Sequence, residues 1–233
     1  MVKKVAILQS NYIPWKGYFD LINMVDEFVF YDDVQFTKND WRNRNIIKTS
    51  NGLQWITIPV YHSSSSKIRD IKVADSKWKK KHWNSLIVNY SQSNYFKEFK
   101  EQFEFMYLGS NELYLSEINF KFILAINNIL GIKTKIKWSW DYKLDGDKNE
   151  RLINLCLQAN GTEYFSGPAA KEYINEKLFE KNNLKLTWVD YDNYLEYTQL
   201  WPPFKHGVSI VDLLFNEGPN ACSFMKSFNR IVL

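Results

Sequence analysis

The amino-terminal part of the chain places an amphipathic stretch between two short apolar runs. Residues 5–8 and 27–31 are brief, partly β-branched and bounded by turn-forming residues, which is typical of buried strands. Apolar residues between positions 18 and 25 recur at helical spacing. A strand, a helix and a strand within this length predict a βαβ unit with parallel strands. The loops that follow such strands lie at one edge of the sheet, where open α/β sheets bind ligands, so we place the functional site there.

The rest of the chain continues this alternation. Further strands are predicted over residues 53–60, 68–73, 133–140, 162–165 and 184–190. Helices are predicted from residue 75 or 76 to 90, and over 94–107, 116–130, about 147–156 and 209–216. Capping-box spacing at Asp147 and a cap at Ser209 mark two helix starts, and Gly131 marks a helix end. Together these patterns predict one α/β domain over residues 1–233, with a mostly parallel sheet. A mainly helical region at about 75–131 packs on the sheet or forms a lobe.

Composition narrows the class of ligand and partner. The net charge of +4 suits an anionic small molecule, whereas nucleic-acid-binding domains are usually more basic and more asymmetric, so a nucleic acid partner is not favoured. No apolar run reaches the ~20 residues of a membrane span, and no signal peptide is recognisable, so the sequence predicts a cytoplasmic protein. Cys156 and Cys222 show no metal-binding or redox spacing, and we expect neither a metal nor a cofactor.

The loop after the first strand combines amide and aromatic side chains. Gln9, Tyr12 and Trp15 lie in this loop, and Gly17 and Tyr18 follow where the helix begins. Glycine permits close approach of a ligand to the backbone, and a helix amino terminus favours anions. The loop is therefore a candidate binding site; the alternative is that it is only a well-packed turn.

The second strand ends in a pair of acids. Asp32 and Asp33 are candidates for a general base, and such a pair could equally bind a metal or cap the next turn.

A basic and aromatic segment follows these acids. Its members Lys38, Trp41, Arg42, Asn43 and Arg44 combine cations with an indole and an amide. Guanidinium groups are well suited to phosphate or carboxylate, so we expect an anion site here, although any one of these cations alone could be ordinary surface charge.

Two later positions add candidates. His82 lies on a helical stripe with Trp78, Leu86 and Tyr90, where it is either a catalytic base or a buried structural histidine. Ser166 and Gly167 follow the short strand over 162–165, and the spacing predicts that Ser166 caps a helix. Lys171, one turn further on, would then face an anion at this second strand-to-helix junction.

Four motifs in this order resemble the WbqC-like family of bacteria. They read QSNYIPWKGYFDLI, FVFYDDVQFTKNDWRNRNIIKT, YFSGPAAKEY and SIVDLLFNEG, and they extend over nearly the whole chain. The resemblance implies a role in the biosynthesis of O-antigen and other surface polysaccharides, with nucleotide-linked sugars, often amino sugars, as the substrate class. One departure is Ser10, where the family pattern has proline.

The layout of the first elements is also similar to that of nucleotidylyltransferases and pantothenate synthetases. Those enzymes carry an HxGH motif at the position where this chain has Trp15-Lys16-Gly17-Tyr18. Both histidines are missing here, so the similarity extends to the fold and not to adenylyl transfer.

Two classes of function follow. In the first, the protein is a transferase that moves an acyl or aminoacyl group from a thioester of coenzyme A or of an acyl carrier protein to a nucleotide-linked amino sugar. Asp33, or failing it Asp32 or His82, would take the proton of the attacking amine, and Lys38, Arg42, Arg44 and Lys171 would hold phosphates. In the second, it binds a sugar nucleotide or a partner enzyme without catalysis.

The topology gives the predicted site a definite form. Parallel strands send their outgoing loops to one edge, so we expect six side chains to line a single pocket. They are Gln9, Tyr12, Trp15, Asp33, Arg42 and Lys171.

Overall fold

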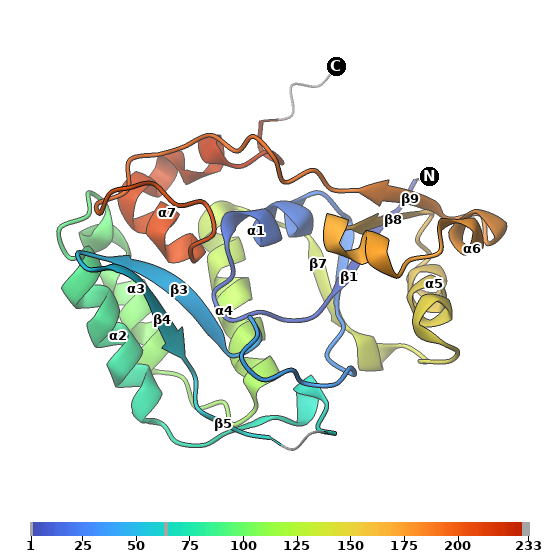
Figure 1. Cartoon of the computed structure of the whole chain (residues 1–233), viewed down its shortest axis with the longest axis horizontal. Coiled ribbons are helices and arrows are strands. Elements are labelled where there is room, and N and C mark those ends of the chain that lie inside the picture. Colours follow the sequence, from blue (N-terminus) through green and yellow to red (C-terminus); the bar gives the residue numbers. More distant parts are fainter. Residues whose placement is uncertain (1, 63–64, 230–233) are drawn as a thin grey trace.

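The computed structural model of the protein describes residues 2–62 and 65–229. Its centre is a five-stranded sheet in the order β7-β2-β1-β8-β9, in which all neighbouring strands are parallel (Figure 1). The strands are β1 (Lys4–Leu8), β2 (Glu27–Phe30), β7 (Lys135–Trp138), β8 (Glu163–Ser166) and β9 (Lys185–Trp188). The predicted α/β fold, including parallel pairing of the first two strands, is confirmed.

The sheet buries side chains on both faces. Ala6, Phe28 and Phe165 belong to one apolar core, and Val5 and Tyr164 belong to another. Successive residues of a strand point to opposite faces, so strands covered on both sides have continuous apolar sequences rather than alternating ones. The short apolar runs read from the sequence follow from this double burial.

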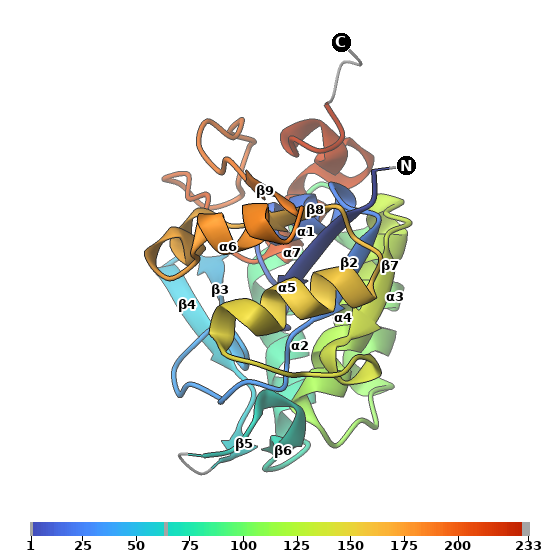
Figure 2. The ribbon, with the colours of Figure 1, turned by 90° about the vertical axis from the view of Figure 1, so that its right-hand side faces the viewer.

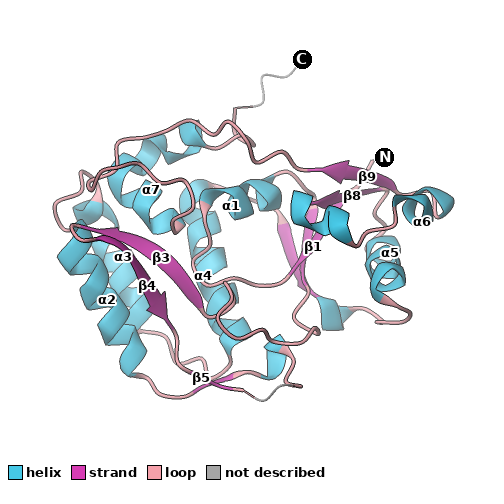
Figure 3. Ribbon diagram, in the orientation of Figure 1, coloured by secondary structure: helices cyan, strands magenta, loops and turns pink. Residues whose placement is uncertain are grey.

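Helices cover each face (Figures 1 and 3). On one side lie α1 (Lys16–Asn23), α2 (Lys77–Tyr90), α3 (Phe96–Leu108), α4 (Leu115–Leu130) and α7 (Ile210–Glu217). Figure 2 shows α5 (Lys148–Gln158) in front of the sheet, with α6 (Glu176–Lys181) also on that side. Helices α2, α3 and α4 occupy the predicted helical region. As the sequence suggests, α4 ends at Gly131, whose φ of 73° is in the left-handed region.

Two predicted strands differ from expectation. Residues 52–57 form β4 (Gly52–Thr57), which pairs antiparallel with β3 (Arg44–Thr49) in a hairpin outside the central sheet. The prediction of a strand over 68–73 is wrong for most of its length. Ile68–Asp70 is a 3-10 turn, and only β6 (Lys72–Val73) pairs with β5 (Val60–Tyr61). Ile68 and Ile71 are both buried, and their spacing of three fits one face of a helical turn better than one face of a strand.

The predicted helix cap at Ser166 is also wrong. Ser166 is the last residue of β8, and its carbonyl accepts a hydrogen bond from the Val189 amide of the neighbouring strand segment. Gly167 then precedes a 3-10 helix, Pro168–Glu172. Because Ser166 takes part in the hydrogen bonding of the sheet, the helical turn begins one residue later than predicted.

The strand order contains a change of direction. The chain leaves β1 toward β2, whereas it leaves β8 toward β9 on the other side of the sheet. The outgoing loops of the adjacent strands β1 and β8 therefore separate. Such a point at the carboxyl edge of a parallel sheet leaves a crevice between loops.

Ser209 caps α7 as predicted and also fixes it to the loop after β1. Its hydroxyl accepts from the Val211 amide and donates to the Ile13 carbonyl at 2.7 Å. Replacement of Ser209 with alanine should lower the free energy of unfolding by about 1–2 kcal/mol, because a helix cap and a buried hydrogen bond are both lost. Urea unfolding monitored by circular dichroism measures this change.

The matched control is Ser76→Ala at the start of α2. Ser76 is exposed and its side chain makes no cap hydrogen bond, so this variant should unfold like the wild type. Equal losses in the two variants would contradict the role given to Ser209.

Candidate functional site

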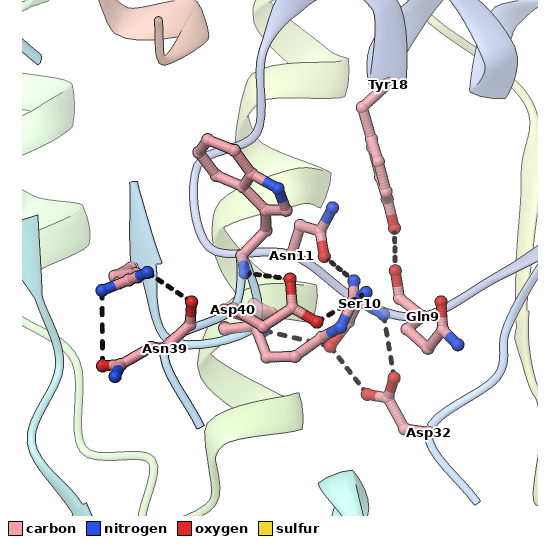
Figure 4. A network of polar contacts seen from close by, with 11 residues as sticks. Gln9, Ser10, Asn11, Tyr18, Asp32, Asn39 and Asp40 are labelled. Carbon is pink, nitrogen blue, oxygen red and sulfur yellow. Dashed lines mark hydrogen bonds and ion pairs between the residues drawn. The ribbon is translucent and has the colours of Figure 1, made fainter. Parts of the chain in front are cut away.

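The loop after β1 is fixed by a buried carboxylate at the end of β2. Asp32 is fully buried and accepts hydrogen bonds from the Ser10 amide at 2.8 Å and the Ser10 hydroxyl at 2.7 Å (Figure 4). A third hydrogen bond comes from the Ser116 hydroxyl at 2.6 Å. Burial raises the pKa of Asp32, while the hydrogen bonds from Ser116 and Ser10 oppose that rise. Asp32 thus positions the loop, and its oxygens are already occupied.

Asn119 of α4 extends this network to the basic segment. Its side-chain nitrogen donates to the Ser10 hydroxyl at 3.0 Å and to the Arg42 carbonyl at 2.9 Å. The Tyr12 amide donates to the Trp41 carbonyl at 3.0 Å. The loops after β1 and β2 therefore meet, as parallel topology predicts.

The Arg42 side chain is only 14% exposed and contacts Asn11 and Asp40. Its guanidinium donates to the side-chain oxygen of Asn11 and lies 3.4 Å from the Asp40 carboxylate (Figure 4). Because the oxygen of Asn11 is engaged by Arg42, the amide nitrogen of Asn11 remains as a donor. Arg42 therefore sets the orientation of the Asn11 side chain.

A cavity of about 390 Å³ opens beside Asn11. Its lining residues, mainly from the loop after β1, the basic segment and a carboxyl-terminal loop, are Asn11, Pro14, Trp15, Trp41, Asn45, His206 and Gly207. We call it the indole cavity, because Trp15 and Trp41 supply its largest side chains.

The Trp15 wall is held in place by its neighbours. Tyr191 and Tyr194 contact its ring edge-on, at centroid distances of 5.3 and 5.6 Å. A side chain at Gly17 would come within 2.3 Å of the indole, so glycine is needed for this ring to fold back over α1. The role of Gly17 is thus to make room for Trp15.

Tyr12 and His82 lie together in the core between α2, α4 and the β1 loop. The Tyr12 hydroxyl is 2.9 Å from Nδ1 of His82 and 3.0 Å from the Tyr107 hydroxyl. His82 Nε2 is 3.2 Å from the Thr57 carbonyl, so this nitrogen carries the hydrogen. Burial lowers the pKa of His82 to about 4. Both ring nitrogens have partners inside the protein.

Asp33 points toward a different set of residues. It pairs with Arg69 at 2.7 Å and Lys67 at 3.4 Å, and it accepts from the Ser139 hydroxyl at 2.8 Å. These partners come from the segment before β6 and the turn after β7.

The remaining candidates are distributed over several surfaces. Arg44 stacks on Trp55 at 4.1 Å, and Lys171 lies over Trp188 at 5.5 Å. Lys38 is exposed, and the Asn43 side chain donates to the Ile58 carbonyl at 2.8 Å. Gly167 lies under the ring of Tyr191, Ser166 is buried, and the Tyr18 hydroxyl donates to the Gln9 carbonyl at 2.9 Å.

The expectation of one pocket lined by six side chains is wrong. Trp15 lines the indole cavity, Gln9 lines a second cavity, and Tyr12 is fully buried. Asp33 and Lys171 are engaged elsewhere. The parallel topology correctly predicted that the backbones of the loops after β1 and β2 lie at one edge of the sheet. It does not determine in which direction each side chain points.

The sequence reasoning missed His206. It lies in the exposed stretch 201–207, WPPFKHG, whose prolines and glycine mark a loop, and an isolated histidine in such a loop was the available signal. Burial and the nearby charge of Lys16 lower the pKa of His206. Lys16 itself is buried, donates to the Leu195 carbonyl at 2.9 Å, and has its pKa lowered by burial to about 8.

Across residues 2–62 and 65–229, no group of histidine, cysteine and acidic side chains is arranged to hold a metal ion. No helix in that same part of the chain is long and apolar enough to cross a bilayer.

Comparison with known proteins assigns the family. The sequence profile of the WbqC-like protein family matches residues 9–224. The chain belongs to the WbqC-like family. A relative from Mycobacterium tuberculosis, named "Uncharacterized protein Rv1507c", is 51% identical over 227 residues, which is 97% of this chain and 98% of the relative. No solved structure matches this WbqC-like chain.

The buried His82 of this WbqC-like protein should make stability depend on pH. The folded state holds its pKa near 4, whereas the unfolded chain has a value near 6.5 and takes up the proton first as pH falls. The free energy of unfolding should therefore fall by about 3 kcal/mol between pH 7 and about pH 4 on account of this residue. Urea unfolding over this range measures the slope.

The slope of the free energy of unfolding against pH, rather than its value at one pH, tests whether the folded state lowers the pKa of His82. His82→Gln should flatten the pH dependence, whereas His62→Gln, at an exposed position, should leave it unchanged. An unchanged slope in His82→Gln would mean that this histidine is protonated alike in both states.

Proposed function

We propose that the protein is a transferase of surface-polysaccharide biosynthesis that acylates a nucleotide-linked amino sugar. The donor is a thioester of coenzyme A or of an acyl carrier protein. The amino sugar binds in the indole cavity. Membership of the WbqC-like family and the resemblance of its motifs support the pathway, and the cavity supports the substrate class.

The observation that carries this proposal is the combination of groups around the indole cavity. Two indoles suit the apolar face of a sugar ring or a base, and the free amide nitrogen of Asn11 is a hydrogen-bond donor. His206 is the titratable side chain in the lining. Since burial lowers its pKa, its imidazole is neutral at pH 7 and able to accept a proton.

The chemistry then assigns one role to each group. The sugar amine attacks the thioester carbonyl, a C–N bond forms, and His206 takes the proton that the amine loses. The Asn11 amide donates to the carbonyl oxygen as negative charge develops on it. The C–S bond breaks, and the departing sulfur takes the proton from His206. Asp32, by this proposal, is a positioning residue that holds the loop.

A non-catalytic sugar-nucleotide-binding protein is the second candidate. Its support is that the earlier candidates for the base are all engaged: Asp32 by two serines, Asp33 by Arg69 and His82 by Tyr12. In that case His206 and Asn11 would only recognise the ligand, and binding would occur without turnover.

Removal of the Trp41 ring should weaken binding. Trp41 is 41% exposed, so Trp41→Ala should fold normally, yet it should bind UDP- or TDP-linked amino sugars about ten- to a hundredfold more weakly. Isothermal titration calorimetry measures the affinity. Trp140→Ala is the matched control, because Trp140 is 39% exposed and stacks on Trp138 away from the cavity. Equal affinities in both variants would remove the indole cavity as the sugar site.

Replacement of the proposed base should lower turnover and leave binding intact. His206→Gln should reduce kcat by about a hundredfold or more, the usual range for loss of a general base. In the wild type, kcat/KM should fall once the pH drops below the lowered pKa of His206, because the imidazole becomes protonated there. Thiol release from acyl-coenzyme A in the presence of amino-sugar nucleotides measures both.

His62→Gln serves as the control, since His62 contacts Phe36 and does not line the cavity. Full activity in His206→Gln would reject His206 as the base. Tight binding of amino-sugar nucleotides with no turnover by the wild type, across the acyl donors tried, would favour the non-catalytic candidate.

A further inference from the structure

A second cavity lies at the carboxyl edge of the central sheet. Its volume is about 270 Å³, and Leu8 at the end of β1 and Tyr31 after β2 contribute to its lining. Lys148 and Arg151 from α5 and Tyr173 from the segment after β8 also line it. We call it the tyrosine cavity. None of the residues that we predicted to hold phosphate lines it.

The location is the one at which open parallel sheets bind ligands. The tyrosine cavity is lined by residues that follow β1, β2 and β8, next to the point where the strand order changes direction. It opens on the face covered by α5, whereas α1 lies on the opposite face (Figure 2). It is therefore separate from the turn that resembles the HxGH position.

The lining of this cavity carries a net positive charge, with Lys148 and Arg151 against the single acid Asp147. Within residues 2–62 and 65–229, no carboxylate forms an ion pair with Lys148 or Arg151. Two acids are close, but both are used in the helix cap. Asp147 accepts from the Glu150 amide at 3.0 Å, and Glu150 accepts from the Asp147 amide at 2.9 Å.

The cations are also held in position. Arg151 donates through Nε to the Gly146 carbonyl at 2.8 Å, which leaves its terminal amino groups as further donors. The Tyr31 hydroxyl is hydrogen-bonded to the same guanidinium. Lys148 lies over the Tyr173 ring, 3.3 Å from its centroid. Burial raises the pKa of both tyrosines, so at neutral pH their hydroxyls remain donors.

We propose that the tyrosine cavity binds the phosphate groups of a phosphorylated ligand. Arg151 provides a planar fork for phosphate oxygens, Lys148 adds a second charge one turn away, and the two phenols add donors. Lys148 and Arg151 are exposed and so accessible to a ligand, and the side chains of Leu8 and Leu152 add apolar surface to the lining.

The two cavities are neighbours along the chain. Gln9 lines the tyrosine cavity and Asn11 lines the indole cavity, so their Cα atoms are at most about 7 Å apart. On the proposed function, the diphosphate in the tyrosine cavity belongs to the sugar nucleotide whose sugar occupies the indole cavity. Phosphate binding itself does not depend on that function.

Calorimetry with inorganic pyrophosphate at low ionic strength tests the proposal. The wild type should bind pyrophosphate, and Arg151→Gln and Lys148→Gln should each bind it about tenfold more weakly or worse. The matched control is Lys143→Gln, which removes the same charge from an exposed lysine paired with Asp145. Thermal melting of each variant confirms that the fold is retained.

Two further ligands identify the source of the phosphate. If UDP binds more tightly than 3′,5′-ADP, the cavity holds the phosphates of the sugar nucleotide. If 3′,5′-ADP binds more tightly, the cavity holds the phosphates of the coenzyme A donor. Absence of pyrophosphate binding, or equal binding by Arg151→Gln and Lys143→Gln, would overturn the proposal. Loss of turnover in His206→Gln with unchanged pyrophosphate affinity separates this test from that of the transferase.

Discussion

The site depends on the hydrogen bonds that the buried Asp32 carboxylate accepts. Each such bond to a charged group contributes about 1.5–3 kcal/mol, and together they offset part of the cost of burying the acid. Two of them fix Ser10, so its neighbours in the chain cannot rotate freely. Gln9 and Asn11 consequently line different cavities. An acid in a position typical of a catalytic residue thus fixes a loop that lines two cavities.

Two other buried acids hold the carboxyl-terminal part of the chain, which has little regular structure before α7. The carboxylate of Asp212 accepts from the hydroxyls of Tyr90 and Tyr197, at 2.9 and 2.8 Å. Asp20 of α1 accepts from the Tyr194 hydroxyl at 2.6 Å and from the amide of Ser227 at 2.8 Å. Side-chain hydrogen bonds replace the backbone ladders of a sheet here, and they hold the segment that carries His206 against the indole cavity.

Periodicity and capping signals predicted most of the fold because they report local backbone preferences. The parallel order of β1 and β2, the capping box at Asp147 and the left-handed Gly131 were all readable in this way. The hairpin of β3 and β4 was not, since an apolar run does not specify its pairing partner. Residue types drew attention to loops that line the two cavities. Asp33 and Arg42 could not be placed from the sequence, because their neighbours Arg69 and Asn11 are close only in three dimensions. His206 is far in sequence from every motif that marked the site.

The indole cavity takes Asn11 from one end of the chain and His206 from the other. During synthesis the central strand β1 leaves the ribosome first, and most of the sheet can pair before the segment from 190 onward is available. A chain interrupted at that stage would hold much of the parallel sheet and still lack one wall of the cavity. The indole cavity is therefore complete only once the segment that carries His206 has been synthesised and has docked. A ligand that contacts both Asn11 and His206 would stabilise docked molecules over partly assembled ones.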